Sequence, residues 1–172
     1  MIQKLLTAVF IIITAIVTAS VFGILHDQVT FTISPEYYTN FKFNQFGLDF
    51  YGKDSHRLLV CIVGILAIWW VGLILGIVFS LMSLFLKTPK EMIAKSMRAV
   101  VITLIITVVT AVIGYLYGRF ILINSDKLMN IYDIKDFENY LIVGSIHKYS
   151  YVGGGIGLFA GSLYISIKAL RG

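Results

Sequence analysis

The sequence predicts an all-α membrane protein: a four-transmembrane-helix bundle with a small β-like or mixed outer loop and an amphipathic outer helix. Three observations predict this class. Apolar residues make up 58% of the chain, against about 45–50% in soluble domains. They gather into four long runs, and basic residues are dense in the short segments between runs. We therefore expect a single transmembrane domain, residues 1–172.

The four apolar runs define the expected spans. A helix needs about 20 apolar residues to cross about 30 Å of hydrocarbon, and the first three runs reach that length. The fourth is shorter, and its start is open because Tyr140–Ile146 is also apolar. The first run exceeds the about 7–15 residues of a signal-peptide core, so we expect it to be retained. The expected spans are residues 5–25, 58–86, 99–122 and 151–167, with outer loops 26–57 and 123–150.

The orientation follows from the basic residues. The N-terminus, the Lys87–Arg98 connection and the C-terminus are short and basic, and Glu91 is the one acid among them. Short connections rich in Lys and Arg stay in the cytoplasm. We therefore expect both termini to be cytoplasmic, the protein to lie in a bacterial inner membrane, and both long loops to be periplasmic.

The net charge of +5 points to membrane lipids rather than nucleic acid, because the charges form no soluble basic face. Thr88-Pro89-Lys90-Glu91 has the pattern of a capping box with proline at the first helical position. No breaker follows before Gly114, so we expect one helix from Pro89 to Gly118. Its first turns would lie at anionic lipid headgroups. The expected headgroup contacts are Lys87, Lys90, Lys95 and Arg98.

Both outer loops carry a pattern. In the first, Val29–Ile33 and Phe41–Asn44 alternate apolar and polar residues, which favours strands. We expect a hairpin or small sheet there, with a short helix starting at Ser34-Pro35-Glu36. In the second loop, Asp133 can cap a segment with apolar residues at i, i+3 and i+7, a pattern typical of a surface amphipathic helix. The apolar positions are Ile134, Phe137 and Leu141.

Three of the expected helices contain glycines four residues apart. This spacing puts the glycines on one helix face and lets backbones approach closely. The first interpretation is packing within the chain. The second is self-association or binding of a protein partner through the same faces. The glycines are Gly72, Gly76, Gly114, Gly118, Gly153, Gly157 and Gly161.

All three histidines, His26, His56 and His147, adjoin outer ends of expected spans, and Asp27 and Asp54 lie beside two of them. Helices pack about 8–10 Å apart, so we expect at least two imidazoles to come close enough to share a ligand. Imidazoles with a carboxylate can bind zinc or copper. No HExxH-type spacing supports a site. The competing interpretation is that each histidine bonds separately to loop backbone or headgroups.

The remaining residues bound the function. No ionisable residue lies in the middle of an expected span, which argues against a proton-coupled transporter. The one cysteine, Cys61, cannot form an internal disulfide, and no cofactor is required by the sequence. We favour a non-enzymatic binding, accessory or assembly component acting through its outer face. The alternatives are a metal-binding site or metal-dependent enzyme at that face, and a small oligomeric channel or carrier.

The first outer loop also carries a resemblance. The stretch His26–Tyr38, continuing into Phe41-Lys42-Phe43 and Gln45-Phe46, resembles a segment of bacterial inner-membrane proteins of unassigned function. The resemblance covers only this short part of the chain. It implies a bacterial inner-membrane protein and no particular activity.

Overall fold

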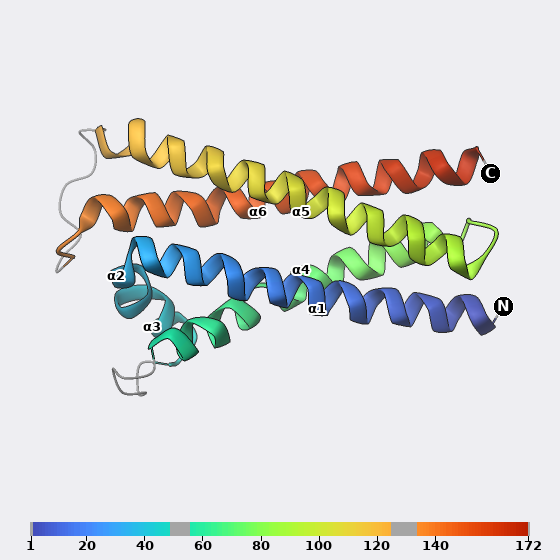
Figure 1. The fold of residues 1–172 in the computed structure, drawn as a ribbon, viewed down its shortest axis with the longest axis horizontal. Coiled ribbons are helices and arrows are strands. Elements are labelled where there is room, and N and C mark those ends of the chain that lie inside the picture. The colour runs from blue at the N-terminus through green and yellow to red at the C-terminus, as the bar shows by residue number, and fades with distance from the viewer. Residues whose placement is uncertain (1, 49–55, 125–133, 172) are drawn as a thin grey trace.

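The computed structural model describes residues 2–48, 56–124 and 134–171, and nearly all of them are helical. Four long helices dominate (Figure 1): α1 (Ile2–Ile33), α4 (His56–Ser83), α5 (Pro89–Phe120) and α6 (Phe137–Leu170). Each is long and apolar enough to cross a membrane. The structure is therefore compatible with an integral membrane protein.

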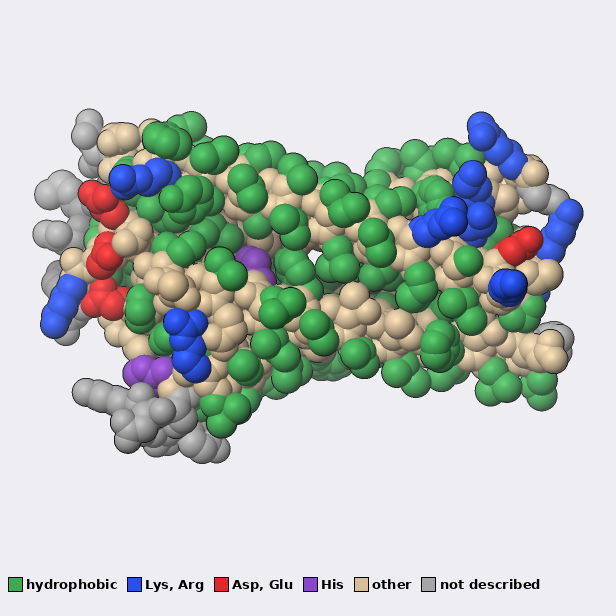
Figure 2. Space-filling model, viewed as in Figure 1, with side chains coloured by type: hydrophobic (Ala, Val, Ile, Leu, Met, Phe, Trp, Pro, Cys, Tyr) green, Lys and Arg blue, Asp and Glu red, His purple; other side chains and the backbone are tan. Residues whose placement is uncertain are grey.

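The long helices form two pairs. Helix α1 packs along α4, and α5 packs along α6 (Figure 1). Both termini and the α4–α5 connection lie at one end, here called the termini end. The opposite, capped end carries a helical cap, residues 34–48, built from α2 (Pro35–Tyr37), η1 (Tyr38–Lys42) and α3 (Phe43–Gln45). Figure 2 shows charged side chains gathered at the two ends and hydrophobic side chains covering the length between them.

The expected β-like outer loop is wrong, since the described residues of this region contain no strand. Val29–Ile33 forms the last turns of α1, and Phe41–Asn44 lies within η1 and α3. The alternating residues suit a helix because their threonines bond back along it: Thr30 Oγ1 donates to His26 O at 3.1 Å and Thr32 Oγ1 to Gln28 O at 2.9 Å. The helix ends only at Ser34-Pro35.

The expected separate amphipathic helix is also wrong. Of its apolar residues, Phe137 and Leu141 belong to the start of α6, which continues unbroken to Leu170, and Ile134 precedes that helix. Asp136 caps this helix by accepting from Asn139 N at 3.2 Å, while Asp133 lies outside the described residues. The segment before Tyr151 contains polar residues, so its sequence does not look like a membrane span. Three of these polar residues are buried in the interior of the structure: Ser145, His147 and Ser150.

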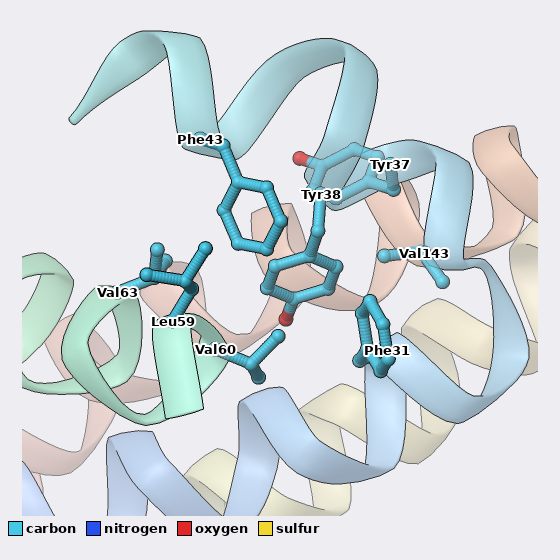
Figure 3. Packing of buried hydrophobic residues seen from close by; sticks show 8 residues of the cluster. All are labelled: Phe31, Tyr37, Tyr38, Phe43, Leu59, Val60, Val63 and Val143. Atoms are coloured by element: carbon cyan, nitrogen blue, oxygen red, sulfur yellow. The ribbon is translucent and has the colours of Figure 1, made fainter. Parts of the chain in front are cut away.

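The helical cap packs its aromatic side chains onto the long helices (Figure 3). Tyr38 is fully buried and points between α1 and α4, where Phe31 lies 5.5 Å from it, centroid to centroid. The hydrophobic cluster that anchors the cap comes from α1, α4, α6 and the cap itself. Its buried members are Phe31, Tyr37, Tyr38, Phe43, Leu59, Val60, Val63 and Val143.

Glycines lie where the paired helices cross most closely. A Cβ built on Gly157 would lie 2.7 Å from Thr103 Cα on α5, and one on Gly72 would lie 2.7 Å from Ala15 O on α1. Gly76, Gly114, Gly118, Gly153 and Gly161 likewise face atoms of neighbouring helices at or below 3.0 Å. Among these glycines, a Cβ built on Gly23 of α1 would come nearest to a backbone atom of another helix, the carbonyl oxygen of Gly64 on α4. Neither of these two glycines belongs to the four-residue spacings.

The expected start of α5 is present at the termini end. Thr88 Oγ1 accepts from Glu91 N at 3.2 Å, and Glu91 Oε2 accepts from Lys87 N at 3.2 Å. The helix runs to Phe120, slightly beyond the expected Gly118. Lys4 joins the first pair at the same end, because its Nζ donates to Leu84 O and Leu86 O at 3.0 and 2.7 Å.

Candidate functional site

Two of the three histidines meet between the helix pairs. His26 and Asp27 of α1 and His147 of α6 place their ligand-forming atoms within 4.8 Å of one another. The two imidazole rings lie edge to face with centroids 4.8 Å apart. The structure therefore brings together three of the five residues considered as metal ligands.

His56 does not join this cluster. It begins α4, and its ring packs at centroid distances of 5.5 Å from Phe43 and 6.4 Å from Phe31. Asp54 lies outside the described residues. The site is therefore formed by α1 and α6, without the start of α4.

The cluster lies within two of the long helices that could cross a membrane, beyond the ends of the expected spans. Asp27 is 3% exposed within α1, and His147 is buried within α6. At 1.5 Å per residue, His147 lies about 15 Å from the start of its helix. The expected spans were ended at their polar residues, whereas both helices continue past them. Ionisable side chains inside spans commonly mark a functional site.

His26 has a hydrogen-bond partner at each of its ring nitrogens. Its Nδ1 lies 3.0 Å from Asp27 Oδ1, and its Nε2 lies 3.1 Å from Ser150 Oγ. Ser150 Oγ donates to Ile146 O at 2.8 Å. The roles of the two ring nitrogens depend on the tautomer: with hydrogen on Nδ1, His26 donates to Asp27, and with hydrogen on Nε2 it donates to Ser150.

His147 has hydroxyl groups beside its Nε2. Thr30 Oγ1 bonds to the α1 backbone and lies 2.6 Å from the Tyr38 hydroxyl oxygen, in a pair where either hydroxyl can be the donor. His147 Nε2 lies 3.4 Å from the Tyr38 hydroxyl and 3.5 Å from that of Thr30, and it donates to them in the tautomer with hydrogen on Nε2. Tyr37 holds the imidazole plane by stacking on it, with centroids 5.2 Å apart and planes 11° apart.

Tyr38 supplies a neutral hydroxyl to this network. Burial raises the pKa of its phenol above the ordinary value, and the negative charge of Asp27 raises it further. Tyr38 therefore stays protonated at neutral pH and does not compete with Asp27 for a cation.

One oxygen of the cluster is unpaired. Asp27 Oδ2 is buried, and no side chain or backbone group among the described residues hydrogen-bonds to it. A buried polar atom without a partner costs about 1–3 kcal/mol. Asp27 lines a cavity, so its carboxylate can accept a hydrogen bond or a cation from a ligand there.

The cavity lies between the two helix pairs and has a volume of about 320 Å³. Its wall is mostly apolar and comes from all four long helices, and residue order places the polar cluster at its capped-end side. In Figure 2 a histidine side chain is visible in a recess between the pairs, beside a narrow gap. Gly154 and Gly155 line the cavity, and a Cβ on either would meet no atom within 4 Å.

Ser150, His26 and Asp27 follow one another as in a serine hydrolase, but their hydrogen bonds do not suit that chemistry. Ser150 donates to Ile146 O instead of to His26. It also lies inside α6, where backbone N–H groups bond along the helix and cannot form an oxyanion hole. The arrangement is better suited to binding than to nucleophilic attack.

The sequence pattern missed Thr30, Tyr38 and Ser150. The signal was present in helical spacing: Thr30 follows His26 by four residues, and Ser150 follows His147 by three, so each pair shares a helix face. Tyr38 could not be placed from spacing because its position depends on how the cap folds back onto the long helices.

The basic residues expected at headgroups lie at the termini end. Lys87, Lys90 and Arg98 are exposed, and Lys95 is half-buried. Lys87 and Lys95 line a groove with Lys168 and Arg171 from the end of α6. The basic residues of two separate segments are thus adjacent in the structure.

Comparison of the chain with known protein families, with curated proteins and with solved structures finds no match. Function is therefore argued from the site itself.

Proposed function

We propose that this protein is a small polytopic membrane protein that binds an amphiphilic small molecule between its two helix pairs, as a non-enzymatic binding component. The apolar body of the ligand lies along the cavity, and its polar group meets His26, Asp27 and His147. The observation that carries the proposal is that Asp27, whose carboxylate has one buried oxygen without a partner among the described residues, lines a largely apolar cavity.

Size and chemistry narrow the ligand. Cavities that bind small molecules commonly enclose about 300–1,000 Å³, and this one lies at the small end. Asp27 Oδ2 requires a donor, so the ligand carries a hydroxyl, an amide N–H or an ammonium group. A single-chain lipid or a short isoprenoid alcohol has this combination.

We also propose that the termini end faces the cytoplasm and that the membrane is a bacterial inner membrane. The density of basic residues at that end supports this orientation, in which these residues would face anionic headgroups. The helical cap then lies at the periplasmic surface, and the polar cluster lies just below it.

Trp70 offers a direct test because it lines the cavity, whereas its neighbour Trp69 does not. A long-chain alcohol with a bromine on its chain should quench Trp70 in the purified Trp69→Phe protein, and the quenching should saturate. In Trp70→Phe, which keeps only Trp69, saturable quenching should be absent.

Two matched variants complete the test. Gly154→Phe places a ring in the open space of the cavity and should abolish saturable quenching. Ile156→Phe places the same phenyl ring at an exposed position on the same helix and should leave saturable quenching intact. Quenching that never saturates, or that is equal in these two variants, would mean that the alcohol only dissolves in the detergent.

A further inference from the structure

We propose that His26, Asp27 and His147 form a binding site for a divalent transition-metal ion, with zinc as the reference ion. This goes beyond the binding of an amphiphile, because the metal needs only side chains of the protein. The site lies at the capped-end side of the cavity, where α1 and α6 face each other.

The neighbouring oxygens allow both imidazoles to act as ligands. In the tautomer with hydrogen on Nε2, His26 donates to Ser150 and His147 donates toward Tyr38 and Thr30. A neutral imidazole with hydrogen on Nε2 presents its lone pair on Nδ1. Metal-binding histidines in proteins are held in this way, with the second nitrogen donating to a neighbouring oxygen.

Asp27 supplies the third ligand and the charge. Nδ1 of neutral His26 and Oδ1 of ionised Asp27 are both acceptors, yet they lie 3.0 Å apart. In the metal-free protein a proton on Nδ1 joins them as an ion pair, and a bound metal ion would take the place of that proton. The second carboxylate oxygen, Oδ2, is buried without a hydrogen-bond partner among the described residues, so it too can contact a bound cation.

The distances suit zinc with a small adjustment. Zinc–nitrogen and zinc–oxygen bonds of about 2.0–2.2 Å in a tetrahedron place ligand atoms about 3.3–3.5 Å apart. The His26–Asp27 pair is already slightly closer than this. The widest separation in the set, up to 4.8 Å, must shrink by about 1.4 Å, which a rotation of side chains provides.

The ligand types favour a transition metal. Two imidazoles and one carboxylate suit zinc or copper, whereas magnesium and calcium prefer oxygen ligands alone. Three protein ligands leave one tetrahedral position free, and this position faces the cavity. Such an open position is the mark of zinc sites that bind a further molecule.

The experiment is a zinc titration of the detergent-purified protein after treatment with a chelator. We expect one zinc per chain and a zinc-dependent rise in Tm. His147→Ala and Asp27→Asn should weaken binding by more than the about 10–100-fold that loss of an outer hydrogen-bond partner costs. Ser150→Ala removes only such a partner and should fall within that range.

His56→Ala is the matched control, because it removes a histidine that lies outside the cluster. Zinc affinity should be unchanged in it. Equal loss in His56→Ala and His147→Ala, or unchanged affinity in Asp27→Asn, would overturn the site. If the variants fail to fold, the wild-type protein still decides, since no rise in Tm with zinc contradicts the proposal.

Gly154→Phe separates this site from the binding of an amphiphile. It fills the cavity but leaves all three ligands, so it should bind zinc with unchanged affinity while losing saturable quenching by the alcohol. Loss of both properties in the same variant would show that the ring disturbs the cluster. The zinc affinities of the His147→Ala and Asp27→Asn proteins would then decide whether the metal site exists.

Discussion

Asp27 and Lys42 are charged side chains that the fold buries almost completely, at 3% and 5% exposure. Burial of a charge is costly unless it is paired. Lys42 lies in the cap, where its Nζ is 5.6 Å from the Phe41 ring centroid and 5.7 Å from that of Phe46. Burial lowers the pKa of Lys42 below its ordinary value, and the negative charge of Asp27 offsets part of this decrease.

Replacement of Lys42 by methionine tests this cost. The folded pKa of Lys42 lies below the ordinary 10.5, so between these two values the unfolded chain binds more protons. Stability of the wild-type protein should therefore rise with pH across that window. At neutral pH we expect Tm of Lys42→Met to be equal to or above that of the wild type, with the gap narrowing as pH rises. A lower Tm in Lys42→Met would show that the contacts with the two phenyl rings outweigh the desolvation.

Gly157 tests packing at the same scale. A Cβ there would meet the Thr103 backbone at 2.7 Å, and overpacking costs about 1–3 kcal/mol. Gly157→Leu should therefore lower Tm in detergent. Gly155→Leu is the matched control, because its Cβ meets no atom within 4 Å. Its Tm should be equal or higher, since leucine favours the helix over glycine by about 0.8–1 kcal/mol. Equal Tm values would mean that the crossing adjusts freely.

These residues show how much of the site could be predicted. Helical spacing places glycines on a face, and the four-residue pattern is visible in the sequence. The pair Gly23 and Gly64 is not visible, because neither has another glycine four residues away and their contact depends on the relative position of α1 and α4. The meeting of His26 with His147 depends in the same way on two helices far apart in the sequence.

At the scale of elements, Glu36 joins the cap to α6. Its carboxylate accepts from Lys135 N at 3.1 Å and from Asp136 N at 2.8 Å. These residues directly precede the first turn of α6, where backbone N–H groups lack partners within the helix. The contact therefore holds the cap over the cluster and fixes the start of the helix that carries His147.

Glu36→Ala should loosen this connection. We expect faster amide hydrogen exchange at Asp136 and in the first turn of α6, and a loss of about 1 kcal/mol in the free energy of unfolding, the usual size for such hydrogen bonds. Glu138→Ala removes a carboxylate from the same turn, where it pairs only with exposed Arg119 at 3.5 Å. Exchange in the Glu138→Ala protein should stay near the wild-type rate, and a similar increase in both variants would remove the special role of Glu36.

The elements themselves were predicted unevenly, for a physical reason. Hydropathy detects the lipid-facing part of a helix, so all four spans were found. It cannot detect that α1 and α6 continue toward the capped end. Near that end both helices bury polar residues, which lower the hydropathy of the segment although the helix continues. The strand-like alternation of Val29–Ile33 misled because residues at a helix end can satisfy either period over so short a stretch.

At the scale of the whole molecule, the two helix pairs explain both the tight crossings and the cavity. Glycine brings α1 against α4 and α5 against α6, so each pair is closely packed. Space is left between the pairs, and its wall carries the polar cluster at one side. The sequence could predict four spans but not this space, because its volume depends on how two packed pairs lie against each other.

The orientation of the molecule is the last prediction. The termini end carries exposed Lys87, Lys90 and Arg98, and dense basic residues resist translocation across a bacterial inner membrane. A fluorescent protein fused after Gly172 or inserted beside Lys90 should therefore fold and fluoresce in the cytoplasm. Alkaline phosphatase at the same positions should be inactive there, because it requires the oxidising periplasm to form its disulfides.

An insertion after Leu48, at the edge of the cap, is the opposite control. It should give active phosphatase and no fluorescence, because the capped end lies at the opposite end of the long helices from the termini. Phosphatase activity at Gly172 or Lys90 would reverse the proposed orientation and place the polar cluster nearer the cytoplasmic surface. The zinc titration would be unaffected by such a reversal, because the proposed metal ligands are all side chains of the protein.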